Sequence, residues 1–196
     1  MRVTILDYGA GNLHSLAKAL DDGSSCVRVE TDPIAAINCD MLVLPGVGAF
    51  GHAAASLAPG RDVLRDAIRG GLPCVGICLG MQLLFDGSDE GPGAGLGVIE
   101  GRVTRVRARR VPHIGWSAIE DMNDGAFERA PIDIAYYANG FACRPSRAEV
   151  VRAWTNADGD RFPAMVREGR AVGVQFHPEK SSRAGVAFLR TLVEEA

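Results

Sequence analysis

The stretch CVGICLGMQ, residues 74–82, runs from a short apolar segment directly into a helical pattern. Its glycine-x-cysteine-x-glycine core is the cysteine version of a nucleophile elbow, a strained corner between a strand and a helix. At such a corner, small residues on both sides of Cys78 avoid steric clashes. The stretch therefore predicts a buried strand that ends at a reactive cysteine.

The sequence before this corner alternates short β-branched segments with helical patterns. An apolar stripe predicts a helix over Arg61–Arg69, and Gly70-Gly71 ends it. This alternation is typical of βαβ units, so we expect a mostly parallel sheet flanked by helices. The expected strands of the first half are 3–6, 27–30, 41–44 and 74–77.

The second half changes character and shows little helical periodicity before its end. We expect antiparallel strands added to one end of the sheet, giving an α/β fold overall. Val186, Leu189 and Leu192 fall on one face of a closing helix. The expected strands of this half are 98–106, 150–154, 164–167 and 171–176.

Composition sets the size and class of the protein. The 196 residues are 47% hydrophobic, which predicts one domain over residues 1–196. The net charge of −3, from 21 basic and 24 acidic residues, argues against a nucleic-acid or anionic-membrane partner. The basic run at 105–110 is an exception, which indicates either a solvated strand end or a patch facing an anionic substrate or acidic partner. No apolar run is long enough to span a membrane, so we expect a cytoplasmic protein.

The five cysteines are odd in number and dispersed, without a C-x-x-C pair or a cysteine-histidine cluster. This spacing predicts neither a disulfide scaffold nor a metal site. Cys78 alone has the neighbours of a nucleophile. At the start of a helix, unsatisfied N–H groups and the helix dipole favour its thiolate and point to where an oxyanion would develop.

A cysteine nucleophile needs a general base, and that base needs an orienting group. His177 follows an apolar strand, Pro178 restricts it to extended geometry, and Glu179 lies two residues later on the same side. We therefore predict the triad Cys78, His177 and Glu179. The remaining histidines are weaker candidates, and only His113, in the stretch PHIGW, keeps a functional interpretation open.

A second oxyanion donor has to come from another loop. The stretch LPGVGAF, residues 44–50, ends a predicted strand with two glycines in three positions, which lets the backbone approach a ligand closely. This loop and the elbow leave the same carboxyl edge of a parallel sheet, where sites in such folds cluster.

Two motifs together carry a family resemblance. GICLGMQ at 76–82 and FHPE at 176–179 resemble the class I (triad) glutamine amidotransferases, and the match spans the chain. The resemblance implies a flavodoxin-like fold and no cofactor. Within this family, further stretches are similar to the glutaminase subunits of imidazole glycerol phosphate synthases. These stretches are DYGAGNL at 7–13, PGVGAF at 45–50, PHIGW at 112–116 and EKS at 179–181.

The resemblance implies a division of labour between two subunits. Cys78 would attack the side-chain amide of glutamine, His177 would protonate the departing ammonia, and backbone N–H groups of Leu79 and Val47 would hold the oxyanion. Ammonia would pass to a cyclase subunit, a (β/α)₈ barrel in a heterodimer, which forms imidazole glycerol phosphate and an aminoimidazole carboxamide ribonucleotide in histidine biosynthesis. The implied glutamine-site residues are Gly46, Val47, Gly48, Leu79 and Gln82. The implied subunit contacts are Trp116, Tyr136 and Lys180.

The sequence departs from the family pattern at two places. ANGF at 138–141 stands where the family usually carries a histidine-serine pair, and Ser117 stands where it carries an asparagine. These changes leave open a paralogous glutaminase that supplies a different barrel synthase.

Three other functions compete with the glutaminase of a synthase. Gly9-Ala10-Gly11 with Glu30 outlines a dinucleotide-binding fingerprint, but His14 occupies the place of the third glycine, where helix and strand must pack closely. A non-catalytic binding module, or a stand-alone hydrolase, would share the fold. The intact triad argues against a non-catalytic binding module, and the expected contact residues Trp116 and Lys180 argue against a stand-alone hydrolase.

Overall fold

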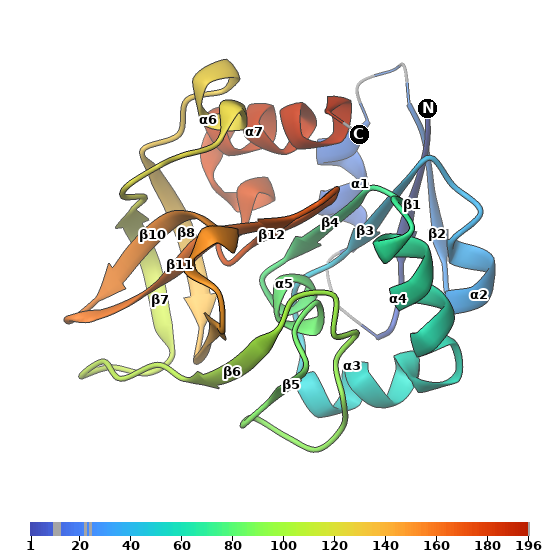
Figure 1. Ribbon diagram of the computed structural model, residues 1–196. Coiled ribbons are helices and arrows are strands. Elements are labelled where there is room, and N and C mark those ends of the chain that lie inside the picture. Colours follow the sequence, from blue (N-terminus) through green and yellow to red (C-terminus); the bar gives the residue numbers. More distant parts are fainter. Residues whose placement is uncertain (10–12, 22, 24, 196) are drawn as a thin grey trace.

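A seven-stranded sheet forms the centre of the structure, a computed structural model that describes residues 1–9, 13–21, 23 and 25–195 (Figure 1). Its strands are β1 (Arg2–Leu6), β2 (Cys26–Glu30), β3 (Met41–Leu44), β4 (Cys74–Ile77), β10 (Val151–Ala157), β11 (Asp160–Glu168) and β12 (Ala171–Val174). Their order is β10-β11-β12-β4-β3-β1-β2. From β12 to β2 all neighbours are parallel, whereas β11 and β10 pair antiparallel at one end. The α/β class predicted from the sequence is confirmed.

Helices cover both faces of this sheet (Figure 1). Side chains alternate along each strand, so Met41 and Val43 of β3 face one apolar cluster, and Leu42 and Leu44 face the other. The first face packs against α1 (Leu13–Leu20), α6 (Gly125–Arg129) and α7 (Ser182–Glu194). The second packs against α2 (Pro33–Ala36), α3 (Phe50–Leu57), α4 (Arg61–Arg69) and α5 (Leu79–Leu83). Within the described ranges no helix is long and apolar enough to cross a membrane.

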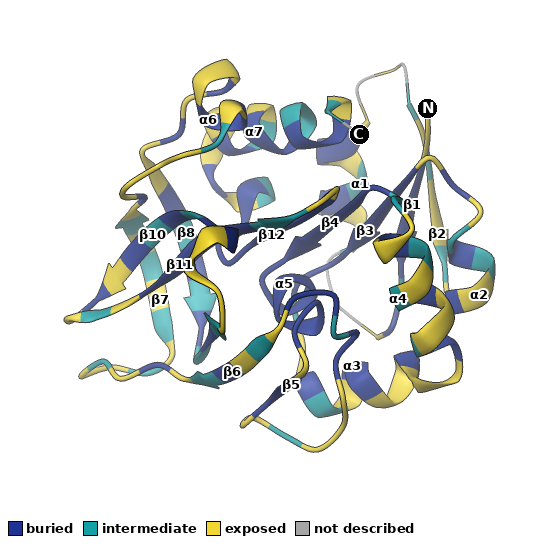
Figure 2. Cartoon of the chain, viewed as in Figure 1, coloured by how far each residue is buried: buried dark blue, intermediate teal, exposed yellow. Residues whose placement is uncertain are grey.

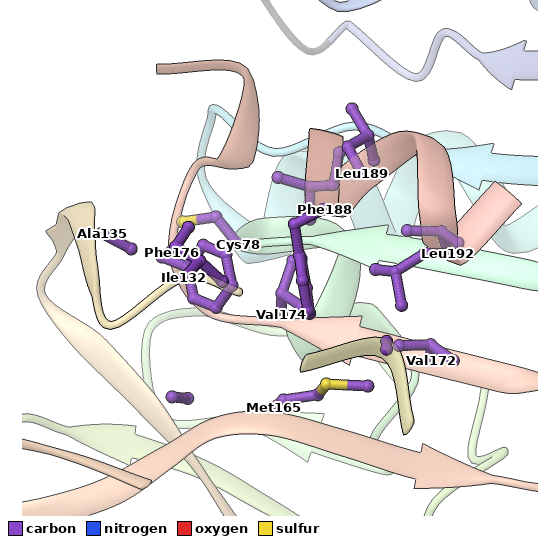
Figure 3. Packing of buried hydrophobic residues seen from close by; sticks show 14 of the residues in the cluster. Cys78, Ile132, Ala135, Met165, Val172, Val174, Phe176, Phe188, Leu189 and Leu192 are labelled. Carbon is purple, nitrogen blue, oxygen red and sulfur yellow. The ribbon is translucent and has the colours of Figure 1, made fainter. Parts of the chain in front are cut away.

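The first cluster carries an aromatic core that reaches the candidate nucleophile. Phe188 of α7 lies 4.8 Å from Phe127 and 5.9 Å from Phe176, measured between ring centroids. Cys78 belongs to the same cluster as Phe176 and Val174 (Figure 3). Burial of each large apolar side chain contributes roughly 1.5–3 kcal/mol, so this packing fixes the segments that carry the site. Figure 2 shows that the central strands are buried and that the outer faces of the helices are exposed.

Two smaller sheets lie beside the central one. The first contains β5 (Gly87–Ser88), β6 (Gly101–Arg105) and β9 (Phe141–Pro145). The second pairs β7 (His113–Ala118) antiparallel with β8 (Ile134–Asn139). None of the β7, β8 and β9 segments was predicted.

The predicted strands of the first half and the helix Arg61–Arg69 are confirmed, and the glycines after it end α4. Two predictions for the second half were wrong. The strand expected at 98–106 begins only at Gly101, because Val98 and Ile99 donate their backbone N–H groups to the carbonyl of Leu84 after α5. The strand expected at 171–176 ends at Val174 and joins the parallel set beside β4.

Candidate active site

The corner after β4 has the geometry of a nucleophile elbow. Cys78 caps α5 with φ 49° and ψ −101°, a strained conformation for a residue with a side chain. A Cβ atom at Gly76 would lie 2.6 Å from the carbonyl carbon of Gly80, and one at Gly80 would lie 2.0 Å from the carbonyl oxygen of Leu44. Both flanking glycines are therefore required by backbone contacts.

Parallel pairing brings the predicted triad to one edge of the sheet. Val174 of β12 lies opposite Ile77 of β4, and the backbone N–H of Cys78 donates to the carbonyl of Val174 at 2.7 Å. The chain therefore leaves β12 beside Cys78. Further along, the N–H of His177 donates to the carbonyl of Tyr136 in β8 at 2.8 Å, which fixes the histidine between the central sheet and the second small sheet.

The predicted orienting pair is formed. Nδ1 of His177 lies 2.9 Å from Oε1 of Glu179, and the two side chains are 1% and 8% exposed. This contact holds the proton on Nδ1 and turns Nε2 away from the carboxylate. Nε2 is buried without a hydrogen-bond partner in the described part of the chain. A buried nitrogen of this kind is ready to exchange a proton with a bound molecule.

Burial lowers the pKa of His177, but the neighbouring Cys78 and Glu179 raise it more, and the result is about 9. An imidazole with this pKa is protonated at neutral pH. It can therefore act as a proton donor to a leaving group.

The loop after β3 lies against the elbow. A Cβ atom at Gly46 would lie 2.3 Å from the carbonyl oxygen of Ile77, and Gly48 has φ +136° with its Cβ position 3.4 Å from Leu79. Val47 lies between these glycines, and Leu79 begins α5, whose first N–H groups lack helical partners. The two predicted oxyanion donors thus come from adjoining segments.

Two contacts hold this loop in place. The buried hydroxyl of Tyr8 donates to the carbonyl of Pro45, and burial raises the pKa of Tyr8, so the hydroxyl keeps its proton. On the other side, Oε2 of Glu90 accepts from the backbone N–H of Phe50 at 2.9 Å, at the start of α3. A carboxylate at a helix N-terminus is stabilising because it complements the helix dipole. The loop is therefore fastened at both ends.

Gln82 and Gln175 meet beside the nucleophile. Nε2 of Gln82 donates to the carbonyl of Phe141 at 3.1 Å and to Oε1 of Gln175 at 3.4 Å. Nε2 of Gln175 donates to Sγ of Cys78 at 3.5 Å. Gln175 was not predicted as a site residue, although it lies only two residues before His177.

The predicted subunit contacts lie on one surface. Trp116 and Tyr136 are opposite each other in β7 and β8, with ring centroids 6.2 Å apart. Exposed fractions reach 50% for Trp116, 62% for Ile114 and 52% for Ile134. Lys180 is exposed in the turn that follows the triad histidine. Together they form an apolar face of the two-stranded β7–β8 sheet next to a basic group, and large exposed apolar patches mark binding surfaces.

The other candidate residues have separate partners. Nε2 of His113 lies 2.9 Å from Oγ of Ser117. A Cβ atom at Gly9 would lie 2.9 Å from Nε2 of His52. Residues 10 and 11 of the competing fingerprint lie outside the described residues. All five cysteines are free thiols, and the described residues contain no group of three or more metal-ligating side chains.

Comparison with known proteins agrees with this geometry. Residues 4–195 match the family Glutamine amidotransferase class-I. The chain is 40% identical to "Imidazole glycerol phosphate synthase subunit HisH 2" of Prochlorococcus marinus (strain MIT 9313), over 96% of this chain and 92% of the relative. It is 43% identical to "Imidazole glycerol phosphate synthase subunit HisH" of Symbiobacterium thermophilum, over 96% of this chain and 91% of the relative.

Solved structures share the fold at lower sequence identity. "Structure of PurLQS from Thermotoga maritima" aligns with a TM-score of 0.73 at 18% identity, covering 99% of this chain and 98% of the other. "Crystal structure of glutamine amidotransferase" aligns with a TM-score of 0.70 at 20% identity, covering 98% and 97%. The elbow, the oriented histidine and these matches lead to one assignment: the chain belongs to the class-I glutamine amidotransferase family.

Proposed function

We propose that this chain is the glutaminase subunit of an imidazole glycerol phosphate synthase. The observation that carries the proposal is the contact of 2.9 Å between His177 and Glu179, beside a strained Cys78 on the same sheet edge. The similarity to synthase subunits over nearly the full length supports the pathway. The reaction converts glutamine and water into glutamate and ammonia.

In the first half of the reaction, the thiolate of Cys78 attacks the carbonyl carbon of the glutamine side-chain amide. The negative charge that develops on the oxygen is stabilised by the backbone N–H groups of Val47 and Leu79. As the carbon–nitrogen bond breaks, protonated His177 gives its Nε2 proton to the nitrogen, and ammonia leaves. The product is a glutamyl thioester on Cys78.

In the second half, neutral His177 accepts a proton from water, which attacks the thioester carbon. The carbon–sulfur bond breaks, glutamate leaves, and the thiolate of Cys78 and the imidazolium of His177 are restored. Glu179 keeps the ring in one tautomer throughout. Gly46, Gly48 and Gln82 line the site in which glutamine would bind.

The ammonia would be passed to a cyclase subunit, a (β/α)₈ barrel, docked on the two-stranded β7–β8 sheet. Trp116 and Tyr136 supply amphipathic rings there, and Lys180 adds a cation close to the triad. A closed route between the subunits keeps ammonia from being protonated or lost in water. The same geometry would serve a different barrel synthase, so identifying the partner decides between the pathway and a paralogue.

The glutaminase activity is expected to fall on the alkaline side, as pH rises through about 9 and His177 loses its proton. Glu179 raises the pKa of His177, so Glu179→Gln lowers this pKa and moves the alkaline limb to lower pH by about one unit. The measurement is kcat/KM for glutamate formation across pH in the complete synthase. Glu149→Gln, an exposed side chain outside the site, serves as the control. An alkaline limb of the kcat/KM profile that stays at the same pH or moves to higher pH would contradict this role of Glu179.

Trp116→Ala is expected to weaken binding of the cyclase subunit by about 30-fold, because a large aromatic side chain at the centre of an interface is a typical hot spot. Titration calorimetry with the purified cyclase subunit measures the loss. Ile34→Ala is a matched control, since Ile34 on α2 is 52% exposed but lies on a different element. Equal losses in both variants would place the interface elsewhere. Binding of the wild-type chain only to a barrel from another pathway would identify a paralogue.

A further inference from the structure

A buried chain of hydrogen bonds connects the turn between β8 and β9 to the nucleophile. The carbonyl of Phe141 accepts from Nδ2 of Asn139 at 3.0 Å and from Nε2 of Gln82 at 3.1 Å. Gln82 then donates to Gln175, whose Nε2 donates to Sγ of Cys78 at 3.5 Å. The three amide side chains are at most 4% exposed. Most buried polar groups are hydrogen-bonded, and these bonds give the three amide groups a specific geometry.

The carbonyl oxygen of Phe141 sets the donor-to-acceptor direction of these hydrogen bonds. A carbonyl oxygen only accepts hydrogen bonds, so Phe141 requires the NH₂ end of Gln82 to face it. The second hydrogen of that NH₂ group is directed to Oε1 of Gln175. The NH₂ end of Gln175 is thereby left facing the sulfur of Cys78. An N–H group, and not a carbonyl oxygen, is held against the nucleophile.

One segment carries both Gln175 and the triad histidine. Gln175 and His177 are two residues apart after β12, and Phe176 between them packs into the apolar cluster that also contains Cys78 (Figure 3). His177 has to lose and regain a proton during the reaction. The amide of Gln175 does not titrate, so its N–H can donate to the sulfur in every step in which a thiolate is present.

We infer that Gln175 is a positioning residue, which holds Sγ of Cys78 and stabilises its thiolate through an N–H···S hydrogen bond. The inference deepens the proposed function and rests on it, because it assumes that Cys78 is the nucleophile. Hydrogen bonds to charged groups are stronger than neutral ones. Loss of this donor should therefore slow reactions of the thiolate by about 10-fold to 100-fold.

Alkylation of Cys78 by iodoacetamide tests this role without glutamine or a partner. Gln175→Met keeps the length of the side chain and removes the donor. At neutral pH we expect alkylation of the full chain at Cys78, followed by peptide mass spectrometry, to slow by about 10-fold or more. The rising part of the rate profile should also move to higher pH. Gln175→Glu still accepts from Gln82 but places a carboxylate oxygen against the sulfur, so alkylation should be slower again.

Thr155→Val is the matched control, because it deletes another buried hydrogen bond, from Thr155 to the carbonyl of Ala118 at 2.8 Å. We expect it to lower stability and leave the alkylation profile of Cys78 unchanged. Wild-type rates and profiles in both Gln175 variants would overturn the inference. If Cys78 of the wild-type chain were alkylated no faster than exposed Cys26, the proposed function would lose its nucleophile, which is a separate result.

Discussion

Replacing Cys78 with alanine is expected to lower glutamine-dependent synthesis by the complete synthase by about 10⁴-fold or more, because no other group can form the thioester. Synthesis from added ammonium salts should remain close to the wild-type rate, since the proposed cyclase subunit would use ammonia directly. The measurement is product formation from glutamine and from ammonium, with the same preparation of both subunits. The ratio of the two activities is the decisive quantity.

Cys39→Ala provides a matched control for this loss. Cys39 is also a buried free thiol, but it follows α2 at a distance from the elbow. We expect this variant to keep both activities. If Cys78→Ala removed ammonium-dependent synthesis as well, the cysteine would be needed for assembly of the synthase and the division of labour would be wrong. A Cys78→Ala enzyme that still used glutamine would place the nucleophile elsewhere.

The parts of the site that depend on local sequence could be predicted. The glycines around Cys78 are dictated by contacts within a few residues and with the neighbouring strand, so the elbow is visible in the pattern itself. The pairing of His177 with Glu179 was also predicted from their spacing, but the expected geometry was different. Glu179 lies in a 3-10 helix, Pro178–Lys180, and not in an extended segment.

Features that depend on distant pairing could not be predicted in this way. Whether β12 runs parallel to β4 is decided by its partner, and an isolated apolar segment carries no sign of direction. The two-stranded β7–β8 sheet was missed because Trp116 and Ile114 face outward, which reverses the usual rule that apolar residues mark the core. These outward-facing apolar side chains belong to the surface proposed for the partner.

The role inferred for Gln175 depends on three elements that lie far apart in the sequence. Gln82 lies on α5, Phe141 begins β9 and Gln175 follows β12. No spacing rule connects them, and only the folded chain shows that a main-chain carbonyl orients both amides. ANGF at 138–141, the departure from the family pattern, lies at this turn, so Asn139 stands at the start of the hydrogen-bond chain that ends at Cys78.

Gly80→Ala is expected to destabilise the fold by about 3 kcal/mol or more, although alanine is the better helix former by about 1 kcal/mol. The added Cβ would lie 2.0 Å from the carbonyl oxygen of Leu44 and 2.7 Å from its carbon. Leu44 cannot easily move, because it pairs with Gly76 in the parallel ladder between β3 and β4. The clash therefore has to push α5 away from the sheet, together with the corner that carries Cys78.

Urea denaturation measures this loss, and Gly125→Ala is the matched control. Gly125 begins α6, and a Cβ atom there would meet no other atom within 4 Å, so alanine should be neutral or slightly stabilising. A Gly80→Ala chain as stable as the wild type would mean that α5 does not pack against β3 as closely as the structure has it. The closest contact that forces a glycine at position 80 would then be absent, and of the two flanking glycines only Gly76 would still be required.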